Sequence, residues 1–185
     1  MSRSTSFALR VPLAAALLAL LLGPAATAAD LGPTAPPKQP RDYPTAPAGQ
    51  VRQGGETLLD AVVLEFPVND VTGTTVGYAD DYDEVCPVIG TAPDVVYTFS
   101  VPSVTIVDID MLGSTYDTKI YLYDQDLNLV ACNDDFYPDY VSKISLQWLQ
   151  PDVQYSLVID GYGSESGDYV LNITQIVPCD LAIPS

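Results

Sequence analysis

Nine short stretches rich in β-branched and aromatic residues follow one another between residues 61 and 177. They are residues 61–66, 72–78, 94–101, 104–110, 118–124, 127–133, 142–149, 153–161 and 168–177. Gly, Asp, Asn and Pro separate them, and no stretch shows the 3.6-residue apolar period of an amphipathic helix. Short strands at this spacing predict an all-β fold, a single antiparallel β-sandwich of jelly-roll type with eight or nine strands.

Two of these stretches alternate clearly enough to assign faces. In residues 118–124, Ile120 and Leu122 share one side while Tyr121 and Tyr123 share the other. In residues 142–149, Ile144, Leu146 and Trp148 occupy every other position, so we expect those three side chains on one face.

The chain divides into four parts by composition. Residues 1–28 have a basic start, an unbroken apolar run and a small-residue site, which are the parts of a secretory signal peptide. Residues 29–55 are rich in Pro and form a linker. Residues 56–177 form the predicted β-domain, and residues 178–185 form a tail. No other apolar stretch is long enough to span a bilayer, so the expected product is secreted or held at the cell surface.

The part that follows the signal peptide is strongly acidic. The chain has 24 Asp and Glu against 7 Lys and Arg, and two of the basic residues, Arg3 and Arg10, lie in the signal. The remaining formal charge is therefore −19. Such a charge argues against nucleic acid and anionic membranes as partners, and it favours bound cations.

The residue types present also restrict the chemistry. The sequence contains no His, which removes the usual general base, the Ser-His-Asp and Cys-His arrangements, and His-ligated zinc. A pair of carboxylates acting as a glycosidase stays open. Three Cys leave three disulfide pairings open, and we favour Cys86–Cys132, because Cys179 lies beyond the last predicted strand.

Two acidic segments are candidates for a calcium site. The first supplies Asp80, Asp81, Asp83 and Glu84, whose charges repel one another unless a cation neutralises them. The alternative interpretation is a solvated loop whose charges are screened by salt.

The second segment supplies Asn133, Asp134 and Asp135, joined by Asp117 or by the first segment. The alternative here is a turn at the end of a strand. Residues 124–128 open like a calcium loop but lack its Gly and its closing Glu, so we interpret them as a hairpin turn.

Several Tyr residues fall in predicted loops, where an aromatic ring with a polar tip suits recognition of protein or glycan. Tyr137, Tyr140 and Tyr162 are the candidate ligand-contact residues. The alternative role for each is packing at the sandwich edge.

Four segments together resemble the bacterial pre-peptidase C-terminal domain family: APDVVYTFSV, STYDTKIYLYD, LVACNDD and IDGYGSESGDYVLNI. The resemblance runs from about Gly55 to Ile176. It implies a secreted, noncatalytic β-sandwich module that supports secretion or binds an extracellular polymer, protein or glycan. Related collagen-binding modules carry calcium, but their ligand motif does not match this chain residue by residue. No peptidase domain precedes the module in this sequence.

The sequence therefore predicts an exported module for extracellular binding, adhesion or secretion support, with calcium as a stabilising ion and no catalysis. The alternatives are an accessory or truncated piece of a larger secreted hydrolase or surface protein, and a two-carboxylate glycosidase.

Overall fold

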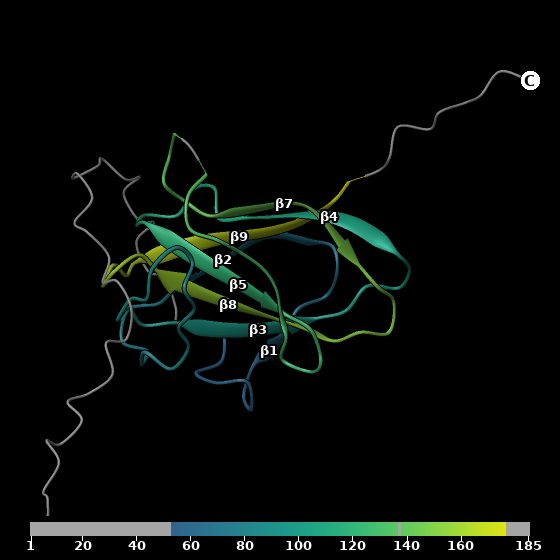
Figure 1. Cartoon of the computed structure of the whole chain (residues 1–185), viewed down its shortest axis with the longest axis horizontal. Coiled ribbons are helices and arrows are strands. Elements are labelled where there is room, and N and C mark those ends of the chain that lie inside the picture. Colours follow the sequence, from purple (N-terminus) through teal and green to yellow (C-terminus); the bar gives the residue numbers. More distant parts are fainter. Residues whose placement is uncertain (1–52, 137, 177–185) are drawn as a thin grey trace, which may run out of the picture. The chain divides into compact units, whose positions relative to one another are not determined.

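The structure, a computed structural model, describes residues 53–136 and 138–176 (Figure 1). Those residues form nine strands and no helix. The strands are β1 (Val62–Val63), β2 (Val68–Thr74), β3 (Val95–Phe99), β4 (Thr105–Asp110), β5 (Thr118–Tyr123), β6 (Leu129–Asn133), β7 (Lys143–Leu149), β8 (Tyr155–Gly161) and β9 (Asp168–Gln175). Within the described residues, no helix is long and apolar enough to cross a membrane. The predicted signal peptide, nearly all of the linker, and the tail with Cys179 lie outside the described residues.

The strands form two sheets that face each other, which confirms the predicted β-sandwich (Figure 1). One sheet has five strands in the order β1-β3-β8-β5-β6, and the other has four in the order β2-β9-β4-β7. All neighbouring pairs are antiparallel except β1 and β3, which run parallel. Strands distant in sequence are therefore neighbours, and β8 lies between β3 and β5.

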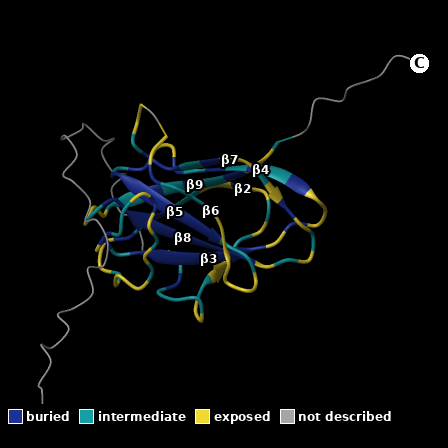
Figure 2. Cartoon of the chain, in the orientation of Figure 1, coloured by how far each residue is buried: buried dark blue, intermediate teal, exposed yellow. Residues whose placement is uncertain are grey.

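The main hydrophobic core fills the space between the sheets. Ile120 and Leu122 of β5 point into it, together with Val107 and Ile109 of β4. The central strands of the five-stranded sheet are the most deeply buried part of the molecule (Figure 2). Ile120 and Leu122 of β5 therefore share the side of the strand that faces the core, as the alternation in the sequence predicts.

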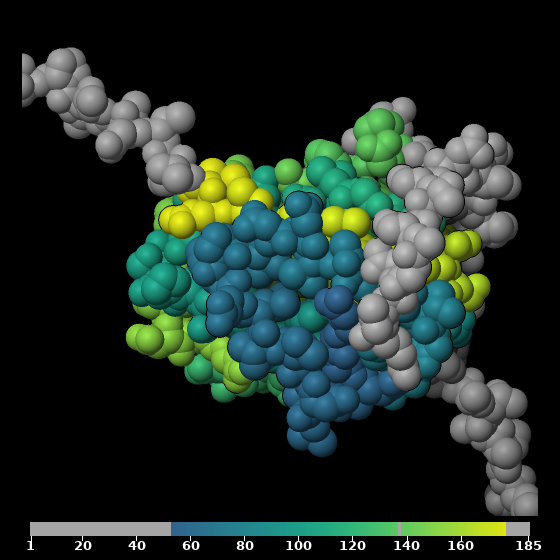
Figure 3. All heavy atoms as spheres, turned by 180° about the vertical axis from the view of Figure 1, so that it is seen from behind, coloured from purple at the N-terminus to yellow at the C-terminus, as the bar shows by residue number. Residues whose placement is uncertain are grey.

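A second, smaller cluster covers the outer side of the five-stranded sheet. Tyr121 of β5 packs there with Val96 of β3 and Val158 of β8. Leu58 and Tyr82, from the segments before β1 and β3, lie over them. Because both sides of these strands are covered, all five residues of β3 and all seven of β8 are buried. Figure 3 shows the first described residues, in blue, spread across one face of the molecule.

A disulfide between Cys86 and Cys132 joins this covering segment to β6. This is the predicted pairing, and the two Cα atoms lie 6.3 Å apart, within the range that a disulfide can bridge. The bond closes the long segment between β2 and β3 against the edge of the five-stranded sheet.

The strand predicted at residues 72–78 is displaced: β2 covers Val68–Thr74, because residues 75–78 form a turn in which Gly77 has a φ of 86°. Two further sequence-based predictions need correction. The first, residues 61–66, forms a strand only at Val62–Val63, and one more hydrogen bond joins the Leu64 amide to the carbonyl of Thr98. The second is the shared face of Ile144, Leu146 and Trp148. Ile144 is buried, whereas Leu146 and Trp148 are 62% and 61% exposed.

The cause of the second difference is a β-bulge. The register between β4 and β7 shifts between Val107 and Ile109, and Leu146 has a φ of 55°. An inserted residue reverses the side to which later side chains point, so Leu149 returns to the core while Trp148 does not.

The turn between β5 and β6 forms as predicted. Asp124 Oδ1 accepts hydrogen bonds from the amides of Asp126 and Asn128, each 2.9 Å long. Leu127 adopts a φ of 60°. Asp and Asn close this turn by binding the backbone, as the hairpin interpretation requires.

Replacing both disulfide cysteines, Cys86→Ser with Cys132→Ser, should lower the free energy of unfolding. The two positions are 46 residues apart, and closing a loop of that size removes unfolded-state entropy worth about 4 kcal/mol. Urea denaturation of the full chain measures the loss, and the reduced wild-type chain should behave like the variant. Equal midpoints for oxidised wild type and variant would contradict this role.

Candidate metal centre

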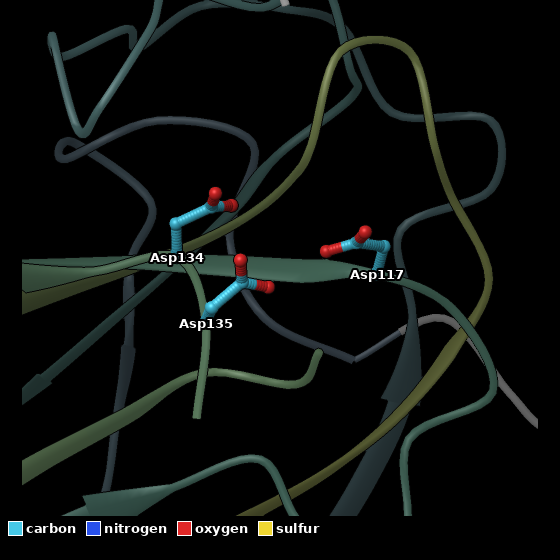
Figure 4. Close-up of side chains that lie close together, drawn as sticks. All are labelled: Asp117, Asp134 and Asp135. Carbon is cyan, nitrogen blue, oxygen red and sulfur yellow. The ribbon is translucent and has the colours of Figure 1, made fainter. Parts of the chain in front are cut away.

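Three of the eight predicted metal-binding residues meet at one end of the sandwich. Asp117 directly precedes β5, while Asp134 and Asp135 directly follow β6. Because β5 and β6 are antiparallel, with Ile120 opposite Asn133, the start of one strand lies beside the end of the other. One carboxylate oxygen from each Asp lies within 4.8 Å of the others, and Figure 4 shows the three carboxylates converging. We call these residues the carboxylate triad.

Thr118 and Ser142 position the backbone beneath the triad. The Ser142 amide donates to Thr118 Oγ1 at 2.8 Å. The Ser142 hydroxyl lies within hydrogen-bonding distance of the backbone carbonyls of Thr118 and Asp134. Both Thr118 and Ser142 are fully buried, so the strand that follows Asp117 and the loop that holds Asp134 are tied to one point.

Burial makes this a costly place for negative charge. Asp117 and Asp134 are 3% and 6% exposed, whereas Asp135 is exposed. Carboxylates this close repel one another unless protons or a cation lie among them. Within the described residues the basic side chains are Lys119 and Lys143, and both form ion pairs with carboxylates outside the triad.

The fourth residue of this segment, Asn133, has another contact. Its side-chain oxygen accepts a hydrogen bond of 2.7 Å from the amide of Lys143 at the start of β7. A cavity of about 420 Å³ adjoins the triad and is lined by Asn133, Asp134, Asp135 and the disulfide. Val85 also lines this cavity, whereas the acidic residues before it do not belong to the triad.

The acidic loop itself is not gathered into one ligand set. Asp83 accepts a hydrogen bond of 3.0 Å from the amide of Gly90, and Glu84 accepts one of 3.0 Å from the Tyr123 hydroxyl. Burial, together with the charges of Asp83 and Asp81, raises the pKa of Asp80. The loop and the triad are therefore separate groups of acids.

Asp94 is a buried acid that the sequence analysis did not single out. It is fully buried, and its Oδ2 accepts hydrogen bonds from the amides of Asp81 and Tyr82 at 2.8 and 2.9 Å. Burial raises the pKa of Asp94 to about 7, and the charges of Asp81 and Asp80 add to the effect. Through its two hydrogen bonds with the backbone amides, Asp94 holds the acidic loop against the sheet.

A second unpredicted group is the ion pair of Lys119 with Asp160. Both side chains are fully buried on neighbouring positions of β5 and β8, with Nζ 3.5 Å from Oδ2. The Tyr121 hydroxyl donates to the same carboxylate at 2.6 Å. Burial raises the pKa of Asp160 to about 7, although the Tyr121 hydrogen bond and Lys119 act in the other direction. Lys119 also donates to the carbonyl of Val88, which fastens the covering loop.

The three tyrosines predicted to contact a ligand differ in where they lie and in how exposed they are. Tyr162 is only 6% exposed, and its amide donates to the carbonyl of Asp117, so it packs beside the triad and offers little surface to a ligand. Tyr140 is partly exposed and has a φ of 51° in the turn between Phe136 and Val141. Tyr137 lies outside the described residues.

Comparison with known proteins gives matches among solved structures. No family model matches the chain, and no curated protein matches it. Among solved structures, the chain is similar to the crystal structure of the pre-peptidase C-terminal domain of collagenase from Bacillus anthracis. The sequences are 18% identical, the match covers 71% of this chain and 100% of that chain, and the TM-score is 0.41.

Asp94→Asn should flatten the pH dependence of stability between about pH 4 and pH 7. A carboxyl whose folded pKa is raised holds its proton more tightly in the folded state. Its contribution to stability is therefore lost as the pH rises from about 4 towards 7, by at most about 1.4 kcal/mol per pH unit.

Urea denaturation at a series of pH values measures this slope. Asn keeps an oxygen for the two amides, so the variant should still fold, and Asp160 should account for the slope that remains. Equal slopes for Asp94→Asn and wild type would show that Asp94 does not titrate in this range.

Proposed function

We propose that this protein is an exported, noncatalytic β-sandwich module that binds at an extracellular surface and is stabilised by calcium at the carboxylate triad. The observation that carries the proposal is the convergence of Asp117, Asp134 and Asp135 at the joined ends of β5 and β6. Binding or adhesion is the role of the module, and the ion is part of its structure.

The donor set fits calcium. Calcium takes six to eight oxygen ligands at about 2.3–2.6 Å, so two oxygens on opposite sides of the ion lie about 4.8 Å apart. The triad oxygens fall within 4.8 Å of one another, and all come from carboxylates, the ligand type that calcium prefers. A bound calcium ion would supply the positive charge that makes ionised carboxylates tolerable at a buried position. Asp117 and Asp134 would hold it from the protein side, and Asp135 from the solvent side.

Several features support an extracellular setting. The disulfide between Cys86 and Cys132 is of a kind that persists in oxidising compartments. The signal-like residues 1–28 and the formal charge of −17 for the whole chain agree with an exported protein in calcium-containing medium. The sequence resemblance to the pre-peptidase C-terminal family supports a module that serves a neighbouring domain or partner.

A two-carboxylate glycosidase receives less support. Such enzymes hold their two carboxyl groups about 5 to 9.5 Å apart, so that a sugar and a water fit between them. Asp117 and Asp134 of the triad are buried, so they offer little surface to a sugar. An accessory piece of a larger secreted hydrolase or surface protein agrees with the same geometry as the proposed module does.

Calcium should raise the melting temperature of the full chain, whereas a chelator should lower it. A ligand that binds only the folded state adds about 2.7 kcal/mol when its free concentration is about 100 times Kd. Calorimetric melting with calcium and with EDTA measures the effect. Asp134→Asn should abolish the response, because it removes a buried carboxylate from the ligand set.

The matched control is Asp152→Asn. Asp152 is exposed in the turn before β8 and has a φ of 59°, which Asn tolerates well. This variant loses the same charge but should keep the full calcium response. A response that is equal in both variants, or equal for magnesium and calcium, would mean that general charge screening is responsible.

A further inference from the structure

A groove on the outer side of the five-stranded sheet is separate from the carboxylate triad. It consists of two adjoining cavities of about 430 and 260 Å³, which share Leu58 and Leu127 as lining residues. Leu58 comes from the segment before β1, and Leu127 from the turn between β5 and β6. The groove therefore runs between two loops that the fold holds over β3 and β8.

Exposed apolar side chains line both cavities, and in the larger one they alternate with polar side chains such as Gln125, Gln154 and Ser156. Leu59, Val63 and Leu127 line the groove and are 99%, 71% and 57% exposed. Tyr82 and Tyr123 line the smaller cavity. Their hydroxyls bond to the Leu58 amide at 2.9 Å and to Glu84 at 3.0 Å, so both rings are held in place. Clustered, exposed apolar side chains of this kind mark sites of interaction.

All of the charged side chains that line the groove are acidic. Asp81, Asp83 and Glu84 line the smaller cavity, and Asp124 lines the larger one. The lining residues include no Lys or Arg, and both lysines of the described chain are engaged with Asp160 and Asp108. A partner that enters this groove must place apolar groups in its centre and positive charge at its rim.

We propose that the groove binds an extended basic peptide segment, with proline or leucine side chains between Leu58, Leu127 and the two tyrosine rings, and with Lys or Arg facing Asp81 and Glu84. Aromatic walls suit proline, because an extended proline-rich segment is already ordered before it binds. The carboxylates exclude acidic peptides and anionic membranes. The partner class is thus a cationic, proline-containing segment of another protein.

Fluorescence polarisation with short labelled peptides tests this directly. The probe is a glycine-flanked Lys-Pro-Leu-Pro-Arg peptide, and its matched control carries Glu in place of both basic residues. The basic peptide should bind the full chain and weaken as salt rises to about 0.5 M, whereas the acidic one should not bind. Binding should be the same with calcium and with EDTA, which separates this site from the triad.

Leu127→Asn is the decisive variant. Asn suits the φ of 60° at this position, so the turn is kept while the wall shared by both cavities is lost. We expect about tenfold weaker binding, the effect of losing most of one apolar contact. Asp81→Asn should reduce the salt dependence. Val104→Ser, at a position that is 54% exposed outside the groove, should change neither.

Three results would overturn the proposal. One is equal binding of the basic and acidic peptides. Another is an affinity that Leu127→Asn leaves unchanged. The third is concentration-dependent dimerisation that Leu127→Asn abolishes while no peptide binds, which would make a second copy of this chain the occupant.

Discussion

The pairing of β5 with β8 is the interaction on which the rest of the structure depends. Six consecutive partners, from Thr118 with Gly161 to Tyr123 with Ser156, place these strands side by side at the centre of the five-stranded sheet. This register directs Ile120 and Leu122 into the main core and Tyr121 towards the outer cluster. It also sets Lys119 opposite Asp160, and the residue just before the strand becomes the first member of the triad.

Scarcity of positive charge is the second constraint. The described residues include many carboxylates but two lysines, which form ion pairs with Asp160 in the interior and with Asp108 near the surface. Other acids are accommodated differently. Asp94 accepts backbone amides, and Asp124 closes a turn. The triad brings three carboxylates together, two of them buried, and we propose that a cation neutralises them. For the acidic side chains that line the groove, we propose a positively charged partner.

Much of the fold can be predicted from sequence, because local patterns of residues determine where the strands and turns form. Alternation in β5, the Asx turn at Asp124 and the strand-separating Gly and Asp residues are all local signals. The bulge at Leu146 cannot be predicted in this way, since it depends on the register against β4. The sequence likewise offers eight candidate ligands, seven acids and Asn133, and the antiparallel pairing of β5 with β6 brings three of them together. Asp94 and the Lys119–Asp160 pair depend on contacts between distant segments, which no spacing reveals.

The most direct test of the central claim is a crystal structure of the full chain grown with calcium, with anomalous diffraction used to locate the ion. The account predicts an anomalous peak among Asp117, Asp134 and Asp135, with carboxylate oxygens at about 2.3–2.6 Å. A structure from a saturating calcium concentration with no peak among these three residues would contradict it.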